Sequence, residues 1–319
     1  MENVILLADK STKAWDFALK IRDHIKEEHC VEIPVEEVLV THFRNGEQRL
    51  EIPRNLRMKD VYFIHDSSKN PQEWWVELLL LKDLCLSSSA SSISFVLPNM
   101  LYSRQDRKDR PHVPVSARAL AASLSPHLAR IITMDLHASQ IQAFYPENIP
   151  LDNLYSAPQV VKYLKEHPLV DLGDTVILSP DAGGAKRAES FAKRLGSPHP
   201  IALIDKRRVN AGIVEKMRLV GDVNGKDVFI VDDIIDSGGT LIAAATELKE
   251  NGARKIYCYG THGIFTKGTA ELKAAFDRVI TSNTHYQERD GIEVVDVSPV
   301  FAEAIYRAQK GLSISELFE

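Results

Sequence analysis

The residue types best suited to chemistry stand together in the segment Phe229–Thr240, where two adjacent carboxylates follow an apolar run. The run is typical of a buried strand, and Asp232 and Asp233 come directly after it. The loop that follows contains Asp236, Ser237, Gly238, Gly239 and Thr240. Backbone N–H groups of such a loop, at the start of a helix, bind phosphate, whereas the carboxylates need a sugar's vicinal hydroxyls or a metal ion. The segment therefore indicates a sugar-phosphate site rather than a surface turn with an acidic cap.

Two other segments place ionisable side chains just after apolar runs. Tyr102–Pro111 holds four cations within seven residues, and their position favours an anion site over a solvated run of charge. In Thr133–Gln140, Asp135 and His137 are two residues apart. Their side chains therefore project to the same side of an extended chain, where both can reach one metal ion or one phosphate.

Three weaker segments have structural explanations as well as functional ones. Leu178–Arg187 contains Asp181, two glycines and a helical pattern, which fits a common strand-to-helix turn or a diphosphate loop. Ile204–Arg208 is a basic loop after a strand, and by itself it fits a solvated surface as well as an anion site. Phe43–Glu47 by itself is only a turn. The chain contains neither GxxxxGK[ST] nor GxGxxG, which excludes a P-loop and a Rossmann pyrophosphate site.

Most of these segments lie where a predicted strand ends, and helical patterns follow several of them. The predicted strands are Val61–His65, Ile93–Leu97, Arg130–Met134, Thr175–Ser179, Ile201–Asp205, Asp227–Val231, Lys255–Tyr259 and Glu293–Val297. The predicted helices are Glu73–Leu86, Ser116–Ser123, Ala185–Leu195, Leu241–Asn251 and one near Phe301–Arg307. Strands that alternate with helices along the chain predict an α/β protein with two mainly parallel sheets, whose ligands bind at the carboxyl ends of strands.

Composition limits the classes of protein to which the chain can belong. Its 319 residues, 26% charged and 44% hydrophobic, suit a globular protein of about two domains. The net charge is −5, charges interrupt the apolar run Trp74–Leu86, and Met1–Lys10 lacks a basic leader, so we expect no nucleic acid and no membrane as partner. Three widely spaced cysteines suit a reducing, cytoplasmic location. The proline-containing stretch 145–160 predicts a domain boundary, giving domains 1–153 and 154–319.

Asp232–Thr240 resembles the ribose-phosphate loop of the type I phosphoribosyltransferase fold. From about Phe43 to the C-terminus, the motifs together resemble the ribose-phosphate diphosphokinase family, also called phosphoribosyl pyrophosphate (PRPP) synthetases. The resemblance implies two phosphoribosyltransferase-like domains, each a mainly parallel sheet flanked by helices. It implies ATP binding by Arg104, Gln105 and Asp109. It also implies that Phe43, Asn45 and Glu47 reach the adenine of a nucleotide bound mainly by a neighbouring subunit. It implies ribose 5-phosphate binding by Asp232, Asp233, Asp236, Ser237, Gly238, Gly239 and Thr240. It implies magnesium contacts for His137, Asp181, Asp135 and Asp152, and catalysis by His137 with Lys206 and Arg208 of a closing flap.

The implied reaction transfers the β,γ-diphosphoryl group of ATP to the 1-hydroxyl of ribose 5-phosphate, giving PRPP and AMP, with Mg²⁺ as cofactor. The resemblance also implies a homo-oligomer, a hexamer built from dimers. One alternative is a non-catalytic regulatory partner of such an enzyme, which predicts a damaged flap or ATP segment. Another is a phosphoribosyltransferase, which needs no ATP segment. The chain departs from the family at Asn55, where many members have a serine, and in Ala8–Thr12, which replaces a Gly-Ser-Ser-like turn.

Overall fold

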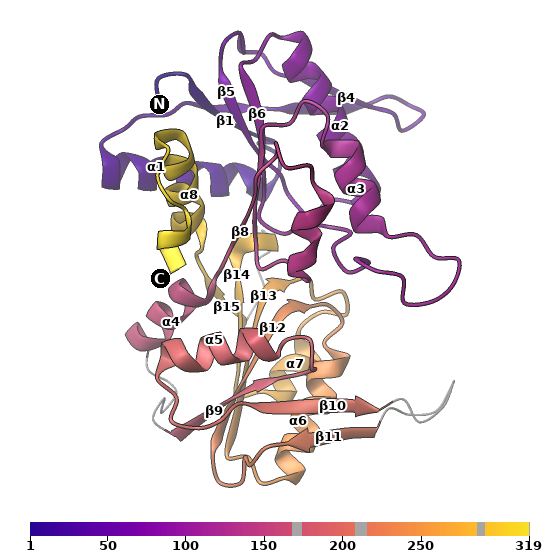
Figure 1. Cartoon of the computed structure of the whole chain (residues 1–319), viewed down its shortest axis with the longest axis vertical. Coiled ribbons are helices and arrows are strands. Elements are labelled where there is room, and N and C mark those ends of the chain that lie inside the picture. Colours follow the sequence, from indigo (N-terminus) through magenta and orange to yellow (C-terminus); the bar gives the residue numbers. More distant parts are fainter. Residues whose placement is uncertain (168–173, 208–215, 286–290, 319) are drawn as a thin grey trace. The chain divides into compact units, whose positions relative to one another are not determined.

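The computed structural model describes residues 1–167, 174–207, 216–285 and 291–318, and the chain divides into two compact units (Figure 1). The first unit contains Met1–Tyr155 and the C-terminal segment that begins at Val297, and the second contains most of the chain between them. The C-terminal segment therefore returns to the first unit, whereas the predicted division into 1–153 and 154–319 puts it in the second.

A six-stranded parallel sheet forms the centre of the first unit. Its strands, in spatial order, are β2 (Val35–Glu37), β1 (Val4–Ala8), β5 (Asp60–Ile64), β6 (Ser92–Leu97), β7 (Arg130–Met134) and β8 (Leu151–Leu154). Its helices are α1 (Lys13–His29), α2 (Pro71–Ser87), α3 (Ser116–Leu124) and α8 (Ser298–Lys310). Alternate residues of β1 enter two apolar cores, Ile5 and Leu7 with α2 and α3, Val4 and Leu6 with α1 and α8. Helices therefore cover both faces of this sheet.

The chain between β2 and β5 forms a separate two-stranded antiparallel sheet of β3 (Leu39–His42) and β4 (Gln48–Glu51). The last residue pair before its turn is His42 with Gln48. Along β4, half-buried and exposed residues alternate, so that one side of the strand faces the unit. The apolar residues that attach this hairpin to the core are Val40, Leu50 and Ile52.

A seven-stranded sheet forms the centre of the second unit, and its strand pairs are parallel apart from β10 with β11. Its strands, in spatial order, are β11 (Lys216–Val220), β10 (Ala202–Arg207), β9 (Thr175–Ser179), β12 (Asp227–Ile235), β13 (Lys255–Gly263), β14 (Arg278–Ser282) and β15 (Glu293–Val295). Its helices are α4 (Ala157–Glu166), α5 (Ala185–Leu195), α6 (Gly239–Glu250) and α7 (Ala270–Ala275). Helices α4 and α5 share one apolar core with the sheet, and α6 and α7 share another. The predicted α/β class is confirmed.

The two sheets have a common strand order. In the first sheet the order is β2-β1-β5-β6-β7-β8, and in the second it is β10-β9-β12-β13-β14-β15 with β11 added at the edge. In both sheets the first strand along the chain is followed by a helix and then pairs with the strands on either side. The turn between β1 and α1 is thus the counterpart of the turn between β9 and α5.

Most predicted elements coincide with observed ones, and the differences have local causes. Strands β7 and β9 and helix α5 have the predicted bounds. As expected, Asn70 caps α2, because its Oδ1 accepts the N–H of Gln72 at 2.9 Å. Strand β12, predicted to end at Val231, continues to Ile235 because β13 pairs with it over that length. Gly260 of β13 permits this contact, since a Cβ there would lie 2.3 Å from Cγ1 of Ile235.

The apolar run expected to form a buried helix is α2, and two of the charges within it are themselves buried. Glu77 is 1% exposed, and Nζ of Lys82 donates to the carbonyl oxygens of Ser123 and Leu124, each at 3.0 Å. These carbonyls belong to the last turn of α3, which has no N–H donor of its own for them. Burial lowers the pKa of Lys82. Throughout the described residues, none of the helices combines the length and the apolar character that crossing a bilayer requires.

We expect Lys82→Met to lower the free energy of unfolding by about 1 kcal/mol. Methionine keeps the apolar stem but leaves the two α3 carbonyls without a donor. The variant no longer has to bury an ammonium group, and this gain offsets part of the loss because it is smaller. Urea unfolding followed by circular dichroism measures the change. The matched control is Asp83→Asn on the exposed side of the same helix, for which we expect a change below about 0.5 kcal/mol. Equal effects of the two substitutions would contradict the capping role of Lys82.

Candidate active site

Parallel pairing of β9 with β12 brings two of the predicted segments to one edge of the second sheet. The turn after β9 contains Asp181, and β12 carries Asp232 and Asp233 close to its carboxyl end. Because neighbouring parallel strands end at the same edge, the β9 turn and the β12 loop adjoin. This arrangement is the one that the sequence predicts for a sugar-phosphate site.

Arg187 of α5 joins the two segments. Its Nη1 lies 3.3 Å from Oδ1 of Asp233 and 3.8 Å from Oδ1 of Asp232. Asp233 is buried, and its N–H donates to Oδ1 of Asp232 at 2.9 Å. Burial, together with the adjacent Asp233 charge, raises the pKa of Asp232 well above its ordinary value, and Arg187 opposes this rise. One guanidinium thus faces two carboxylates, which keep acceptor capacity for further donors such as sugar hydroxyls.

Glycine shapes the turn after β9. Oδ1 of Asp181 accepts the N–H of Gly184 at 3.0 Å, and Oγ of Ser179 donates to the carbonyl oxygen of Asp181 at 2.7 Å. A Cβ at Gly184 would lie 2.5 Å from Oγ of Ser179, so a larger residue fits only if the turn shifts. Asp181 is exposed, and its second carboxylate oxygen has no protein partner within the described residues. The turn therefore presents a carboxylate oxygen and small residues to solvent.

The loop between β12 and α6 is attached to the chain that follows β13. Oγ1 of Thr266 donates to Oδ1 of Asp236 at 2.8 Å, and the N–H of Thr266 donates to the carbonyl oxygen of Asp236 at 3.2 Å. Gly238 caps α6 with a φ of +78°, a conformation that favours glycine. The rest of the loop is accessible: half-buried Ser237, exposed Gly239 and exposed Thr240. The first turn of α6, whose N–H groups lack acceptors within the helix, is thus open to an anion.

The two predicted flap residues lie at the same edge or outside the described residues. Strand β9 ends at Ser179, which pairs with Leu203 of β10. Beyond that pair β10 continues with β11 alone, and Lys206 lies in this continuation, opposite Met217. Arg208 falls outside the described residues. The backbone of β10 therefore carries the position of Lys206 past the carboxyl end of β9.

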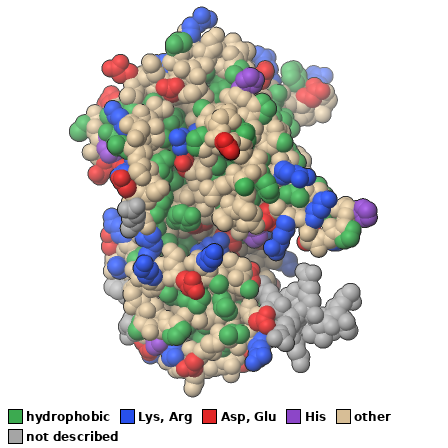
Figure 2. All heavy atoms as spheres, in the orientation of Figure 1, with side chains coloured by type: hydrophobic (Ala, Val, Ile, Leu, Met, Phe, Trp, Pro, Cys, Tyr) green, Lys and Arg blue, Asp and Glu red, His purple; other side chains and the backbone are tan. Residues whose placement is uncertain are grey.

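In the first unit, the neighbouring strands β6 and β7 bring together the loops that carry predicted ATP residues. Nε2 of Gln140 donates to Oδ2 of Asp106, which ties the loop after β6 to the segment after β7. Oγ of Ser116 donates to Oε1 of Gln105 at 2.5 Å, which attaches the same loop to the start of α3. Figure 2 shows Lys and Arg side chains gathered over this loop. The remaining predicted residues of the loop, both exposed, are Arg104 and Asp109.

Asp135 and His137 follow β7 as expected, whereas Asp152 does not join them. Asp135 is buried, has a φ of +42°, and donates its N–H to the carbonyl oxygen of Leu154 at 2.9 Å. His137 is exposed. Asp152 of β8 forms an ion pair with Arg130, the first residue of β7, at the opposite end of that strand from Asp135. In the parts of the chain that the structure describes, no group of three or more His, Cys, Asp or Glu side chains is arranged to hold a metal.

The turn of the β3–β4 hairpin carries the last three predicted ATP residues. Phe43 is 56% exposed. The N–H of Phe43 donates to the carbonyl oxygen of Glu47 at 2.8 Å, and Oδ1 of Asn45 accepts the N–H of Glu47 at 3.2 Å. The hydrogen-bonded turn thus presents an aromatic ring that can stack on a planar ligand. It also uses the side-chain oxygen of Asn45 internally.

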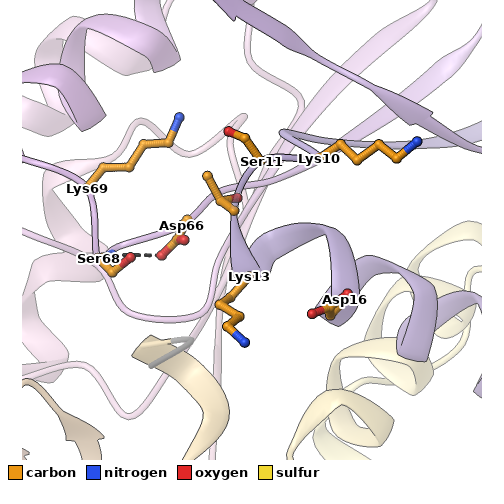
Figure 3. A pocket seen from close by; sticks show the side chains of 8 residues that line it. Lys10, Ser11, Lys13, Asp16, Asp66, Ser68 and Lys69 are labelled. Atoms are coloured by element: carbon orange, nitrogen blue, oxygen red, sulfur yellow. Dashed lines mark hydrogen bonds between the residues drawn. The ribbon is translucent and has the colours of Figure 1, made fainter. Parts of the chain in front are cut away.

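A pocket of about 520 Å³ lies in the first unit, where β1 and β5 end and α1 begins. Three lysines line it, and Figure 3 shows Lys10, Lys13 and Lys69 pointing to different sides of the space. The N–H of Ser68 donates to Oδ1 of Asp66 at 2.8 Å, and burial raises the pKa of Asp66. Because the ammonium groups do not converge, we assign no anion to this pocket.

Sequence reasoning gave no role to Arg187, although the residue ends the Leu178–Arg187 segment. The position of Arg187 in its helix could nevertheless have indicated a role. Arg187 is the third residue of α5, and a cation in the first turn of a helix is unfavourable beside the positive end of the helix dipole. Such a cation is therefore better explained by a carboxylate outside the helix, and Asp233 is that carboxylate.

Comparison with known proteins extends the resemblance over both units. A model of the N-terminal domain of ribose phosphate pyrophosphokinase matches residues 9–127, and a model of the phosphoribosyl synthetase-associated domain matches residues 207–319. The chain is 42% identical over 289 residues to ribose-phosphate pyrophosphokinase 2 of Schizosaccharomyces pombe, covering 88% of this chain and 89% of the relative. The chain belongs to the ribose-phosphate pyrophosphokinase family. The family predicted from the motifs is thereby confirmed.

Two further relatives of this pyrophosphokinase family member support the same family assignment. The ribose-phosphate pyrophosphokinase of Wolinella succinogenes is 40% identical over 291 residues, covering 90% of this chain and 92% of the relative. The crystal structure of phosphoribosylpyrophosphate synthetase from Mycobacterium smegmatis superposes with a TM-score of 0.84 at 30% identity, covering 97% of this chain and 99% of that one. The similarity spans the segments that carry the candidate active site in each unit.

We expect Asp232→Asn to raise the free energy of unfolding at pH 8, on the order of 1 kcal/mol. The pKa of Asp232 is raised in the folded protein, so its stabilising contribution is fully present below the unfolded pKa and is lost as pH rises through the folded one. Each pKa unit corresponds to about 1.4 kcal/mol. Urea unfolding of wild type and variant between pH 4 and pH 8 measures the difference, which should shrink toward low pH.

The matched control lies on the same strand. Asp227 is buried and pairs with Nε of Arg254 at 2.7 Å, so Asp227→Asn removes an ion pair and should destabilise the protein. A variant of Asp232 that is less stable than wild type at pH 8 would contradict the account of this carboxylate pair.

Proposed function

We propose that the chain is a ribose-phosphate diphosphokinase, which transfers the β,γ-diphosphoryl group of ATP to O1 of ribose 5-phosphate and releases AMP. One observation carries this proposal: two glycine-containing loops flank a carboxylate pair at a single edge of the second sheet, and Arg187 links them. A phosphate-binding helix start beside hydroxyl-accepting carboxylates matches the two ends of a ribose phosphate. The 40–42% identity to named ribose-phosphate pyrophosphokinases supports the same reaction.

The ribose 5-phosphate would be held entirely by the second unit. The 5-phosphate would accept hydrogen bonds from backbone N–H groups at the open start of α6. These N–H groups belong to the loop that contains Asp236, Ser237, Gly238, Gly239 and Thr240. Asp232 and Asp233 would accept hydrogen bonds from the ribose hydroxyls. Positioning of the 1-hydroxyl and neutralisation of charge on the transferring group suffice for this chemistry, so no covalent intermediate is required. Lys206 and Arg208 would supply the cations that stabilise that charge.

ATP would be bound by the residues of the first unit that family resemblance selects. Arg104 and Gln105 lie in a loop tied to both α3 and the segment of His137, so the loop and His137 can act on one nucleotide. Phe43 would stack on the base of a nucleotide bound mainly by a neighbouring subunit, with Asn45 and Glu47 beside it. Asp109 would also contact the nucleotide. His137 would contact the ATP phosphates.

Mg²⁺ is the cofactor that we propose for the reaction. Magnesium commonly uses one or two carboxylates and completes its shell with water and substrate phosphates, so a cage of three protein ligands is not required. The exposed Asp181 fits this demand because one of its carboxylate oxygens has no partner within the described residues. Asp135 and His137 are further candidates, whereas Asp152 is engaged by Arg130 and is left out. When bound, the ion would supply positive charge to the transferring phosphates.

We also propose a homo-oligomer, by family resemblance a hexamer built from dimers, in the cytoplasm. Exposed apolar side chains at Phe43, Val76 and Leu80 support association, because aromatic and aliphatic residues are commonly buried in interfaces between subunits. Three free cysteines, of which Cys30 is exposed, suit a reducing compartment.

The proposal is tested by incubating purified protein with ATP, ribose 5-phosphate and Mg²⁺ and separating the products by chromatography. We expect AMP and PRPP in equal amounts, and a loss of at least about 100-fold in kcat for Lys206→Ala, as for other groups that stabilise transferring charge. The matched control is Lys249→Ala, which removes an exposed lysine near the end of α6 and should keep wild-type rates.

The other outcomes identify the alternatives. Folded protein that binds nucleotide but releases no AMP would refute the enzyme and favour a non-catalytic partner of such a synthetase. Consumption of PRPP with a purine or pyrimidine base, without any need for ATP, would instead identify a phosphoribosyltransferase.

A further inference from the structure

A buried cluster of charges lies in the first unit, apart from the proposed substrate contacts. Nζ of Lys69 donates to both carboxylate oxygens of Glu77, at 2.9 and 2.8 Å, and to Oδ2 of Asp9 at 2.7 Å. Asp9 and Glu77 are buried, and Lys69 is nearly so, with 13% of its side chain exposed. The three residues come from the loop after β1, the loop after β5 and the middle of α2. The cluster therefore fixes these three segments to one another.

Positive charge is in short supply in this cluster. His65 lies 3.6 Å from Oε2 of Glu77, but its ring nitrogen is bonded to the carbonyl oxygen of Trp74 at 3.0 Å. Burial, with the Lys69 charge beside it, lowers the pKa of His65 to about 3, so the imidazole is neutral at physiological pH. Two carboxylates thus face one ammonium, and Glu77 needs an additional donor.

Gln48 of the β3–β4 hairpin supplies that donor. Its Nε2 donates to Oε1 of Glu77 at 3.0 Å. Its own Oε1 is buried without a hydrogen-bond partner among the described residues. An unpaired buried acceptor is unfavourable, so simple filling of space does not explain an amide at this position. Donation to Glu77 does explain it, and it also fixes which way the amide is turned, because the opposite orientation would set oxygen against carboxylate.

Gln48 stands at the point of the hairpin where anchoring has most effect on the turn. It directly follows Glu47, and its partner across the hairpin, His42, directly precedes Phe43. Among the described residues, the hairpin pairs with no strand of the six-stranded sheet. Val40, Leu50 and Ile52 also attach it to the core by apolar contacts, and apolar contacts set direction less sharply than a hydrogen bond to a charged group.

We infer that Gln48 is a positioning residue for the nucleotide. Its hydrogen bond to Glu77 fixes the turn that carries Phe43, Asn45 and Glu47, and the fixed turn orients the nucleotide. This inference rests on the proposed function, in which that turn contacts the base of ATP. The contacts of Asp9 with Lys69, of Lys69 with Glu77 and of Glu77 with Gln48 link the loop after β1 to the first residue of β4, directly after the turn. Loss of Gln48 leaves the turn intact but releases its orientation.

The test uses Gln48→Met in the full-length protein, which keeps the volume and removes both the donor and the unpaired acceptor. We expect the Kd for α,β-methylene-ATP, measured by calorimetry with Mg²⁺, to rise about tenfold. In the steady-state assay, KM for ATP should rise similarly, while KM for ribose 5-phosphate stays within about twofold. The matched control is Arg49→Met, on the exposed side of the same strand, for which both constants should stay unchanged.

A second readout tests the anchor itself. Hydrogen exchange followed by mass spectrometry should show faster exchange of the hairpin peptide in Gln48→Met and in Glu77→Gln, with little change in the peptide of β6. If Gln48 acts through Glu77, the double variant should weaken nucleotide binding no more than the stronger single variant.

The outcomes separate this inference from the proposed function. Absence of AMP and PRPP from the wild-type reaction would refute the function, yet the analogue's Kd and the hairpin exchange would still decide the role of Gln48. A Kd for the analogue that is within twofold of wild type in Gln48→Met would overturn the positioning role. A parallel loss of nucleotide affinity, ribose 5-phosphate affinity and thermal stability would overturn it as well, because that pattern indicates general unfolding.

Discussion

Parallel pairing is the constraint on which the candidate site depends. It sends the carboxyl ends of β9 and β12 to one edge of the second sheet, so that two turns far apart along the chain become neighbours. Arg187 then lies between them and partly compensates two adjacent carboxylates that would otherwise repel each other. Burial and the Asp233 charge together raise the pKa of Asp232, and Arg187 offsets them only in part. Such residual strain is expected where a protein keeps acceptors ready for a ligand rather than for its own side chains.

The same pairing rule operates in the first unit with different side chains. The shared strand order places the turn after β1 where the second unit has its Asp181 turn. In the first unit, however, this position holds Asp9, whose carboxylate is already bonded to Lys69, and the lysines around it point apart. The predicted nucleotide residues lie instead after β6 and β7 and on the hairpin. One topology thus positions two different sets of side chains, and side chains rather than strand order decide what a site binds.

Much of this arrangement could be predicted from the sequence, because strand ends, helix caps and glycine loops are local signals. Asn70 capped its helix as expected, and the carboxylates of β12 lie at the predicted edge. Contacts between distant segments could not be predicted in this way. The pairing of Asp152 with Arg130 and the return of α8 to the first unit both depend on which segments meet in space. Helix α1 is not among the predicted helices, although Phe17, Ile21 and Ile25 line its buried side at helical spacing.

The charges within α2 show how an apparent interruption in a pattern can carry information. Glu77 and Lys82 break an apolar run, and such breaks are commonly attributed to a solvated face. Here both side chains are buried, and each satisfies groups on another element: Lys82 the last carbonyls of α3, Glu77 the donors of Lys69 and Gln48. A buried charge is tolerated only where such partners exist. In an otherwise apolar helix it therefore identifies the segments that the helix must hold in place, and for Glu77 one of these is the hairpin beside the proposed nucleotide site.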